Sequence, residues 1–218
     1  MNSAQTDSKV KISASLIIQM LRYARSLNID ISYILKKFHI GDKITDFPDE
    51  KISLEKYLKI EEELVLLTGD IYFGLHMGEY VEPGSWSILG YIMMNCDSIE
   101  ESILKLQRYS SVVGNLFKID VKSQKSITEI NLLSVRGGLS ISRHCVEAAL
   151  SSLICVIHGL IDEKIFPFQV EIALERPERV EEYQRVFQCP VHFNAEETRI
   201  FFSARNLKKK LIIPISYS

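Results

Sequence analysis

One segment past the middle of the chain carries apolar side chains on most faces of a helix. Its apolar residues are Cys145, Val146, Ala148, Ala149, Leu150, Leu153, Ile154, Val156 and Ile157. A helix that is apolar nearly all round has to be covered by other elements. Ser151, His158 and Gly159 interrupt the segment, so it falls short of the roughly 20 apolar residues that span a bilayer. We therefore expect residues 142–161 to form the central helix of a soluble protein.

The chain before this segment has the spacing of amphipathic helices. Apolar residues recur at three- and four-residue steps in segments 12–27, 53–68 and 98–109. Ser98 and Glu101 fit the capping box that begins a helix. Further short helices are predicted over residues 30–38, 70–78 and 86–95. The first 80 residues are expected to be all helical.

The pattern changes after about residue 110. Segments 116–121 and 126–133 alternate apolar and polar residues around a polar turn, as the strands of a hairpin do. Further strands are predicted over 168–174 and, as a pair, over 191–193 and 199–202, with a helix over 178–187. The sequence thus predicts an α+β fold, with a helical N-terminal half and a mixed half whose antiparallel-rich sheet packs on helices. The expected organisation is a flexible N-terminus (1–11), a helical lobe (about 12–110) and a mixed lobe (about 111–211).

Composition and charge narrow the class of protein. With 218 residues, 46% of them apolar, the chain can bury a substantial core. Lys and Arg number 26 against 28 Asp and Glu, for a net charge of -2. This balance does not supply the broad basic surface that sequence-independent phosphate binding requires. We expect the chain by itself not to hold DNA tightly.

Several site classes lack their sequence signature. The polar segment 1–9 is unlike a secretory signal, so a cytoplasmic location is expected. The four cysteines form no Cys-x-x-Cys pair and the five histidines lack zinc-site spacing, so we expect reduced thiols, no metal and no cofactor. Neither a Gly-x-Ser-x-Gly elbow nor a glycine-rich phosphate loop occurs. We expect no catalytic residues and no enzyme activity.

Two groups of motifs carry a family resemblance. The first is Gly74-Leu75-His76-Met77-Gly78 followed by Glu82-Pro83-Gly84-Ser85-Trp86-Ser87-Ile88-Leu89-Gly90-Tyr91. The second runs from Glu178 to Asn194 and contains Tyr183, Val186-Phe187, Cys189-Pro190-Val191 and Phe193-Asn194. In this order they resemble the N-terminal effector-sensing domain, of the arabinose-binding type, of AraC/XylS-family transcription regulators. The resemblance extends over about residues 12–211.

The resemblance implies a bacterial, cytoplasmic regulator of virulence or metabolism with no membrane association. Residues 12–211 would form a sensor and dimerisation domain that binds a small organic effector. A homodimer is expected, with the helices that begin at Ser98 and Ser142 as candidate contact surfaces. The family's helix-turn-helix half, through which DNA would be bound, does not follow Leu211, and residues 212–218 would begin a linker. A truncated regulator and a natural stand-alone sensor both remain open, as does a ligand-independent oligomerisation or protein-interaction module.

Candidate effector contacts gather where the two lobes would meet. The candidate ligand-binding residues are Trp86, Tyr91, Arg108, Tyr109, Arg143 and His144. The three aromatic side chains combine an apolar body with a polar tip, which suits an organic ligand in a mostly apolar pocket. The three basic side chains could pair with an effector carboxylate. Core packing of the tryptophan and surface salt bridges of the basic residues are the alternatives.

Overall fold

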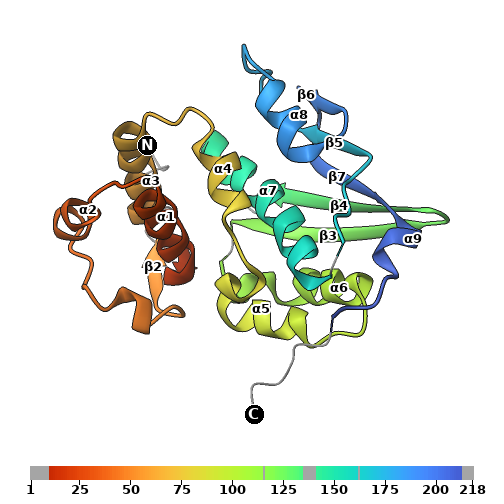
Figure 1. Ribbon diagram of the computed structural model, residues 1–218, viewed down its shortest axis with the longest axis horizontal. Coiled ribbons are helices and arrows are strands. Elements are labelled where there is room, and N and C mark those ends of the chain that lie inside the picture. The colour runs from red at the N-terminus through yellow and green to blue at the C-terminus, as the bar shows by residue number, and fades with distance from the viewer. Residues whose placement is uncertain (1–9, 115, 135–140, 162, 213–218) are drawn as a thin grey trace, which may run out of the picture.

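The computed structural model describes residues 10–114, 116–134, 141–161 and 163–212, and Figure 1 shows their arrangement. The predicted α+β fold is confirmed, with a group of helices on one side and a helix-covered sheet on the other. Most of the predicted flexible N-terminus (1–9) and of the predicted linker start (213–218) lies outside the described residues. Val10 is buried and Lys11 already belongs to a strand, so neither is part of a free tail. No helix in the described ranges has the length and apolar character needed to cross a membrane.

The first group of elements comprises residues 10–68, and the name helical lobe is used for this group from here on. Its elements are β1 (Lys11–Ser13), α1 (Ala14–Ser26), α2 (Ser32–Lys37), the 3₁₀ turn η2 (Ile44–Asp46), β2 (Lys51–Ser53) and α3 (Leu54–Thr68). The expectation that the first 80 residues are all helical is wrong for β1 and β2, which pair antiparallel with Ile12 opposite Ile52. Each strand runs directly into a serine that caps the next helix, Ser13 for α1 and Ser53 for α3. The helices therefore begin where the backbone turns from extended to helical at these caps.

The central region follows, from residue 73 to residue 112. It contains α4 (Phe73–Glu79), the 3₁₀ turn η3 (Pro83–Trp86), α5 (Ser87–Met94), α6 (Ile99–Tyr109) and the 3₁₀ turn η4 (Ser110–Val112). At the start of α6 the Ser98 hydroxyl accepts from the Glu101 amide at 3.2 Å, as the capping box predicts. The Glu101 carboxylate accepts instead from the amide of Asp97, at 2.9 Å.

The mixed lobe holds a five-stranded sheet in the order β3-β4-β7-β5-β6. Its elements are β3 (Phe117–Gln124), β4 (Ile127–Ser134), α7 (Arg143–Leu160), β5 (Gln169–Ile172), α8 (Glu181–Phe187), β6 (Val191–Phe193), β7 (Thr198–Ser203) and α9 (Ala204–Leu207). The first four strands in this order pair antiparallel, and only β5 and β6 pair parallel. The predicted hairpin, strands and helices all appear, with ends shifted by a few residues. The predicted pairing of 191–193 with 199–202 is wrong, because β5 lies between β6 and β7 in the sheet.

Helices α4 and α7 join two hydrophobic cores. One core contains the apolar faces of α1 and α3, and the other contains α5, α6, α7 and the inner face of the sheet. Leu75 and Leu150 belong to the second core, whereas Met77 and Ala148 belong to the first. In Figure 1 α4 and α7 accordingly lie between the helices of residues 14–68 and the sheet. The cores divide near α4, which does not coincide with the lobe boundary predicted near residue 110.

Close packing of α4 on α7 depends on a glycine. A Cβ atom added at Gly74 would lie 2.2 Å from the carbonyl oxygen of His144, far inside van der Waals contact. That oxygen is backbone, so it cannot swing away as a long side chain could. Only glycine lets α4 approach α7 this closely.

Candidate functional site

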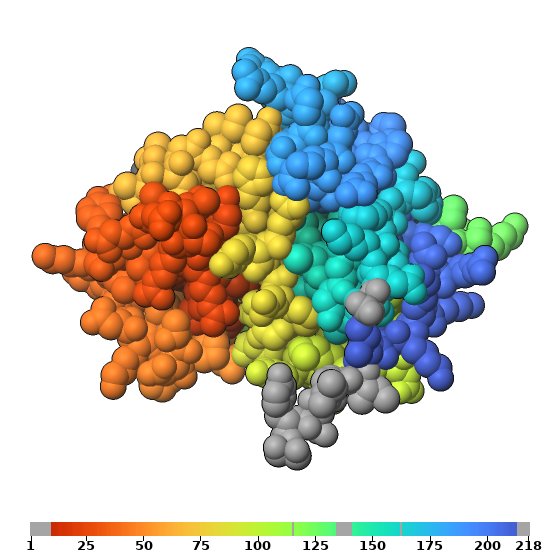
Figure 2. All heavy atoms as spheres, in the orientation of Figure 1, coloured from red at the N-terminus to blue at the C-terminus, as the bar shows by residue number. Residues whose placement is uncertain are grey.

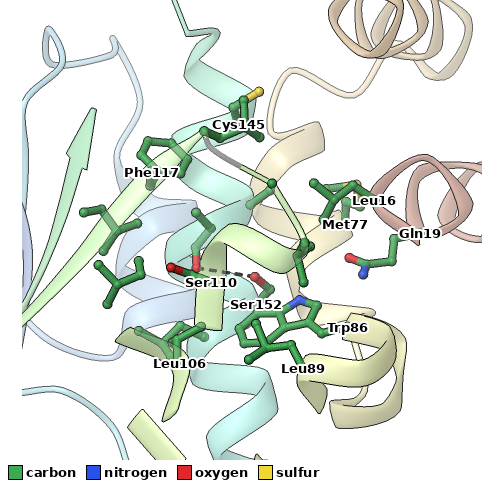
Figure 3. Close-up of a pocket in the computed structure, with 18 of the residues that line it drawn as sticks. Leu16, Gln19, Met77, Trp86, Leu89, Leu106, Ser110, Phe117, Cys145 and Ser152 are labelled. Carbon is green, nitrogen blue, oxygen red and sulfur yellow. Dashed lines mark hydrogen bonds between the residues drawn. The ribbon is translucent and has the colours of Figure 1, made fainter. Parts of the chain in front are cut away.

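An apolar cavity of about 130 Å³ lies between the two cores. Its walls come from both lobes, with Leu16 on α1, Met77 on α4, Trp86 on η3, Phe117 on β3 and Leu153 on α7. Figure 3 shows several of these side chains around the same space. Figure 2 shows the helical lobe (red and orange) and the mixed lobe (cyan and blue) on either side of the yellow region of α4. The cavity therefore lies at the junction of the two lobes, and ligand pockets preferentially occur at such junctions.

The turn before α5 directs Trp86 into this cavity. Glu82 and Ser85 form a capping box around η3, which holds the turn. Gly90 lies so close to the turn that an added Cβ would be 1.9 Å from the carbonyl oxygen of Pro83. The absence of a side chain at this position lets η3 fold back on α5. Trp86 is 9% exposed and lines the cavity.

The polar groups in the cavity wall are few and uncharged. None of the described residues that line the cavity is Asp, Glu, Lys, Arg or His. Gln19 donates from Nε2 to the carbonyl oxygen of Ser85 at 2.9 Å, and the Ser152 hydroxyl is 3.3 Å from the carbonyl oxygen of Ala149. The further polar groups of the lining belong to Ser110, Tyr57, Cys145 and the indole of Trp86. Such a surface suits an apolar, uncharged group with one or two hydrogen bonds.

A buried polar group lies behind the wall formed by Tyr57 and Cys145. Glu61, on α3, accepts hydrogen bonds from the Ser142 hydroxyl and, at 3.3 Å, from the Cys145 thiol. Burial raises the pKa of the Glu61 carboxyl, and it raises the pKa of the Cys145 thiol well above its ordinary value. Both shifts favour the neutral forms. These bonds connect α3 of the helical lobe to the start of α7.

The structure brings one of the six predicted ligand residues, Trp86, to the cavity. Tyr91 is 58% exposed on α5, and the Arg108 guanidinium lies over the Tyr109 ring, 5.3 Å from its centroid. None of these three residues lines the cavity. That these three residues contact an effector stays a prediction, and that effector would have to bind outside this cavity.

The remaining two predicted residues take part in internal polar contacts. Arg143 donates to the Tyr183 hydroxyl at 3.2 Å and to the carbonyl oxygen of Glu175 at 2.8 Å. His144 Nδ1 lies 3.2 Å from Glu147 Oε2, and Glu147 is fully buried. Burial alone lowers the pKa of His144, but the Glu147 carboxylate outweighs it and the net pKa is raised. These contacts link α7 to α8 and to the loop after β5.

Sequence reasoning missed most of the cavity wall. Leu16, Met77 and Phe117 have the apolar spacing of ordinary core residues, and nothing in that spacing separates a cavity wall from a filled core. Gln19 is the exception. It lies three residues after Leu16 on the buried side of α1, and it is 6% exposed. A polar side chain on an apolar face was a signal that could have been used.

A second cluster joins α4 to α8. His76 Nδ1 lies 2.7 Å from Asp70 Oδ2, and His76 Nε2 lies 2.8 Å from Glu182 Oε1. The hydrogen bond with Asp70 is the main cause that raises the pKa of His76 to about 9. His76, Glu79 and Glu182 place one ligand atom each within 4.8 Å of one another, a set that could hold a metal ion. No local pattern in the sequence indicated such a set, because its members lie up to 106 residues apart.

The same carboxylates already have a cationic partner. Arg185 donates from Nη1 to Glu79 at 2.9 Å and from Nε to Glu182. A metal ion would have to displace this guanidinium from both carboxylates. The arrangement as it stands is a charge network that fastens α8 to α4.

Comparisons with known proteins show the family of this chain and two similar regulators. Residues 29–211 match the family described as the arabinose-binding domain of AraC transcription regulator, N-terminal. The ornithine utilization regulator of Pseudomonas aeruginosa is 19% identical over 154 residues, which make up 71% of this chain and 45% of the relative. The crystal structure of the transcriptional regulator CdpR from Pseudomonas aeruginosa is similar with a TM-score of 0.63 and 13% identity, over 90% of this chain and 57% of that chain. The chain thus spans about half the length of these relatives.

Proposed function

Because the chain belongs to the family of arabinose-binding domains found at the N-terminus of AraC transcription regulators, we propose that its apolar cavity binds a small-molecule effector. The observation that carries this proposal is the position of the cavity between two cores, with walls from α1 on one side and from β3 and α7 on the other. A ligand in this place contacts both lobes. It therefore acts on their relative arrangement, provided that it binds one arrangement more tightly than another.

The cavity wall indicates the chemistry of the bound group. An engineered apolar cavity of roughly 150 Å³ holds benzene, so about 130 Å³ suits a group the size of a six-membered ring. A sugar would need a hydrogen-bonding partner for each hydroxyl, whereas most of the lining is apolar. The polar side chains of the lining are Gln19, Tyr57, Trp86, Ser110, Cys145 and Ser152, and three of these, Gln19, Cys145 and Ser152, already donate to groups of the protein. The family's name is thus no guide to the ligand of this chain, and we propose an apolar group instead.

Control of transcription needs parts that this chain does not span. We propose that the effector changes how an attached DNA-binding part is presented, and that the regulator acts in the bacterial cytoplasm. A homodimer is part of the proposal, with the outer face of α6 as the contact surface. Leu104 on that face is 50% exposed, whereas most of α7, the other predicted contact helix, is buried. Light scattering at tens of micromolar protein should report a dimer, and a monomer mass would contradict this part.

The alternative is a ligand-independent oligomerisation module, and a thermal-shift experiment separates the two. We expect the neutral probe 2-phenylethanol to raise the melting temperature, because a ligand present at about ten times its dissociation constant stabilises the folded state by about 1.4 kcal/mol. Ala149→Leu should abolish the shift, since Ala149 lines the cavity and the larger side chain fills it. The control Ala173→Leu, at an exposed alanine, should keep it. No shift with the wild-type chain, or an equal shift in both variants, would contradict the proposal.

A further inference from the structure

A second and more polar cavity adjoins the apolar one. It has a volume of about 410 Å³ and lies beside α1, α4 and η3. Gln19 and Met77 line both cavities, and the neighbours Ser85 and Trp86 line one each. Gln19 and Met77 therefore form part of a wall that the two spaces share, and Met77 is a flexible side chain. For one ligand to occupy both cavities, the Met77 side chain has to move aside.

Gln19 is positioned to contact a ligand at this junction. Its side-chain amide points into the space between Met77 and Trp86 (Figure 3). Nε2 donates to the carbonyl oxygen of Ser85, but within the described part of the chain Oε1 accepts no hydrogen bond. Gln19 is 6% exposed, so most of this side chain lies against the protein and the cavities, and Oε1 keeps its acceptor capacity there. It can accept a hydrogen bond from a ligand N–H group.

The second cavity also carries charges of both signs. Arg22 and Glu82 line it, and among residues 10–114, 116–134, 141–161 and 163–212 neither forms a salt bridge. Glu79 lines it too, but the Arg185 guanidinium already holds that carboxylate. Glu82 keeps acceptor capacity beyond its capping role at Ser85. One cationic and one anionic side chain thus remain available on the same cavity.

We propose that the ligand is a small zwitterion with an apolar side group, of the kind of an apolar α-amino acid. This rests on the proposed function, because the side group occupies the effector cavity. The ammonium group lies toward Glu82 and Gln19, and the carboxylate pairs with Arg22. Arg22 and Glu82 are both exposed, so water solvates them and each can contribute only a weak ion pair to a ligand. A head group with both charges forms both of these pairs, whereas a singly charged head group forms only one.

Four probes that share one phenyl ring test the proposal by calorimetry on the intact chain. L-Phenylalanine carries both charges, 2-phenylethylamine only the ammonium, 3-phenylpropanoate only the carboxylate, and 2-phenylethanol neither. We expect phenylalanine to bind most tightly, 2-phenylethanol least tightly and the two singly charged probes between them. Each missing charge should weaken binding about twofold to fivefold, the range of partly exposed ion pairs.

Two variants assign each charge to its partner. Arg22→Gln should weaken phenylalanine and 3-phenylpropanoate by the same twofold to fivefold while leaving 2-phenylethylamine unchanged. Glu82→Gln should weaken phenylalanine and 2-phenylethylamine while leaving 3-phenylpropanoate unchanged. The glutamine amide oxygen can still accept the hydrogen bond at the η3 turn. Arg25→Gln, on the same helix as Arg22, and Glu62→Gln are matched controls at exposed positions outside both cavities. Equal melting temperatures of the variants show that each is folded.

The outcomes distinguish the two proposals. If 2-phenylethanol binds in the apolar cavity but phenylalanine binds no more tightly, the zwitterion is wrong and the effector cavity stands. The zwitterion is equally overturned if the two variants fail to discriminate between the singly charged probes. If none of the four probes binds, both proposals fail. The crossed pattern of losses supports the assignment, because a merely structural role of Arg22 or Glu82 would affect all probes alike.

Discussion

The packing of α4 on α7 gives a sharp test of the structure through Gly74→Ala. The new Cβ would lie 2.2 Å from a backbone oxygen of α7, whereas ordinary contact begins at 3.4 Å. Helix α4 would have to move away by about 1.2 Å. Forcing an extra methyl group into a packed core costs about 1–3 kcal/mol. This cost is opposed by the gain in helix propensity from glycine to alanine, about 1 kcal/mol.

The packing cost should exceed the gain in helix propensity, because the obstacle is a backbone carbonyl in a long helix and both cores depend on the position of that helix. A clash with backbone places the packing cost in the upper part of its range, about 2–3 kcal/mol, so we expect Gly74→Ala to lower the free energy of unfolding by about 1–2 kcal/mol net. The measurement is urea denaturation followed by far-ultraviolet circular dichroism. Gly41→Ala is the matched control, since an added Cβ there meets nothing within 4 Å. It should be neutral or up to about 1 kcal/mol stabilising.

The result that refutes this reasoning is a Gly74→Ala chain as stable as the wild-type chain, or more stable, while Gly41→Ala behaves as expected. The propensity gain would then exceed the packing cost. Helix α4 could not lie as close to α7 as the structure has it.

Three further predictions concern single side chains. Trp86→Ala should weaken the binding of 2-phenylethanol by at least about 1 kcal/mol in calorimetry, whereas Tyr91→Ala should leave it unchanged; equal effects would contradict the placement of the cavity. The pKa of His76 is raised to about 9, so its contribution to stability is complete below pH 6.5 and is lost as the pH rises through 9. The stability deficit of His76→Gln, on the order of 2 kcal/mol, should therefore shrink over that range in urea titrations, and a constant deficit would count against the charge network. Because the pKa of Glu61 is also raised, the wild-type chain should lose stability relative to Glu61→Gln as the pH rises above 4.5, and the opposite trend would show an ionised, stabilised carboxylate.

The sequence predicted the elements whose signals are local. Helices with a clear apolar stripe and a serine cap, such as those after Ser53 and Ser98, appear where expected. The alternating hairpin of β3 and β4 also appears. The strands β1 and β2 could not be predicted, because three residues are too few to show alternation and the partner strand lies about 40 residues away. The helical spacing of the neighbouring residues therefore led to a helical prediction for both strands.

The candidate site was predictable only in part, for a related reason. Trp86 was identified because a tryptophan after a Pro-Gly turn is a local feature of the sequence. Arg143 was given a ligand role because no local feature shows that Tyr183, 40 residues away, contacts it. For His144 a local signal was present and was not used, because Glu147 lies three residues later on the same helix. Whether an apolar side chain fills a core or borders a cavity depends on volumes summed over several elements. Such sums are not encoded in the spacing of any one segment.

Helices α4 and α7 belong to both hydrophobic cores, and this has a consequence for how the molecule comes apart. Met77 and Ala148 face one core, while Leu75 and Leu150 face the other from the same two helices. Neither core can open without uncovering the helices that complete its neighbour. Unfolding should therefore be one cooperative transition, in spite of the two-lobed arrangement. For the same reason, a chain cut at residue 70 should yield no independently folded half, and a ligand bound between the lobes stabilises both at once.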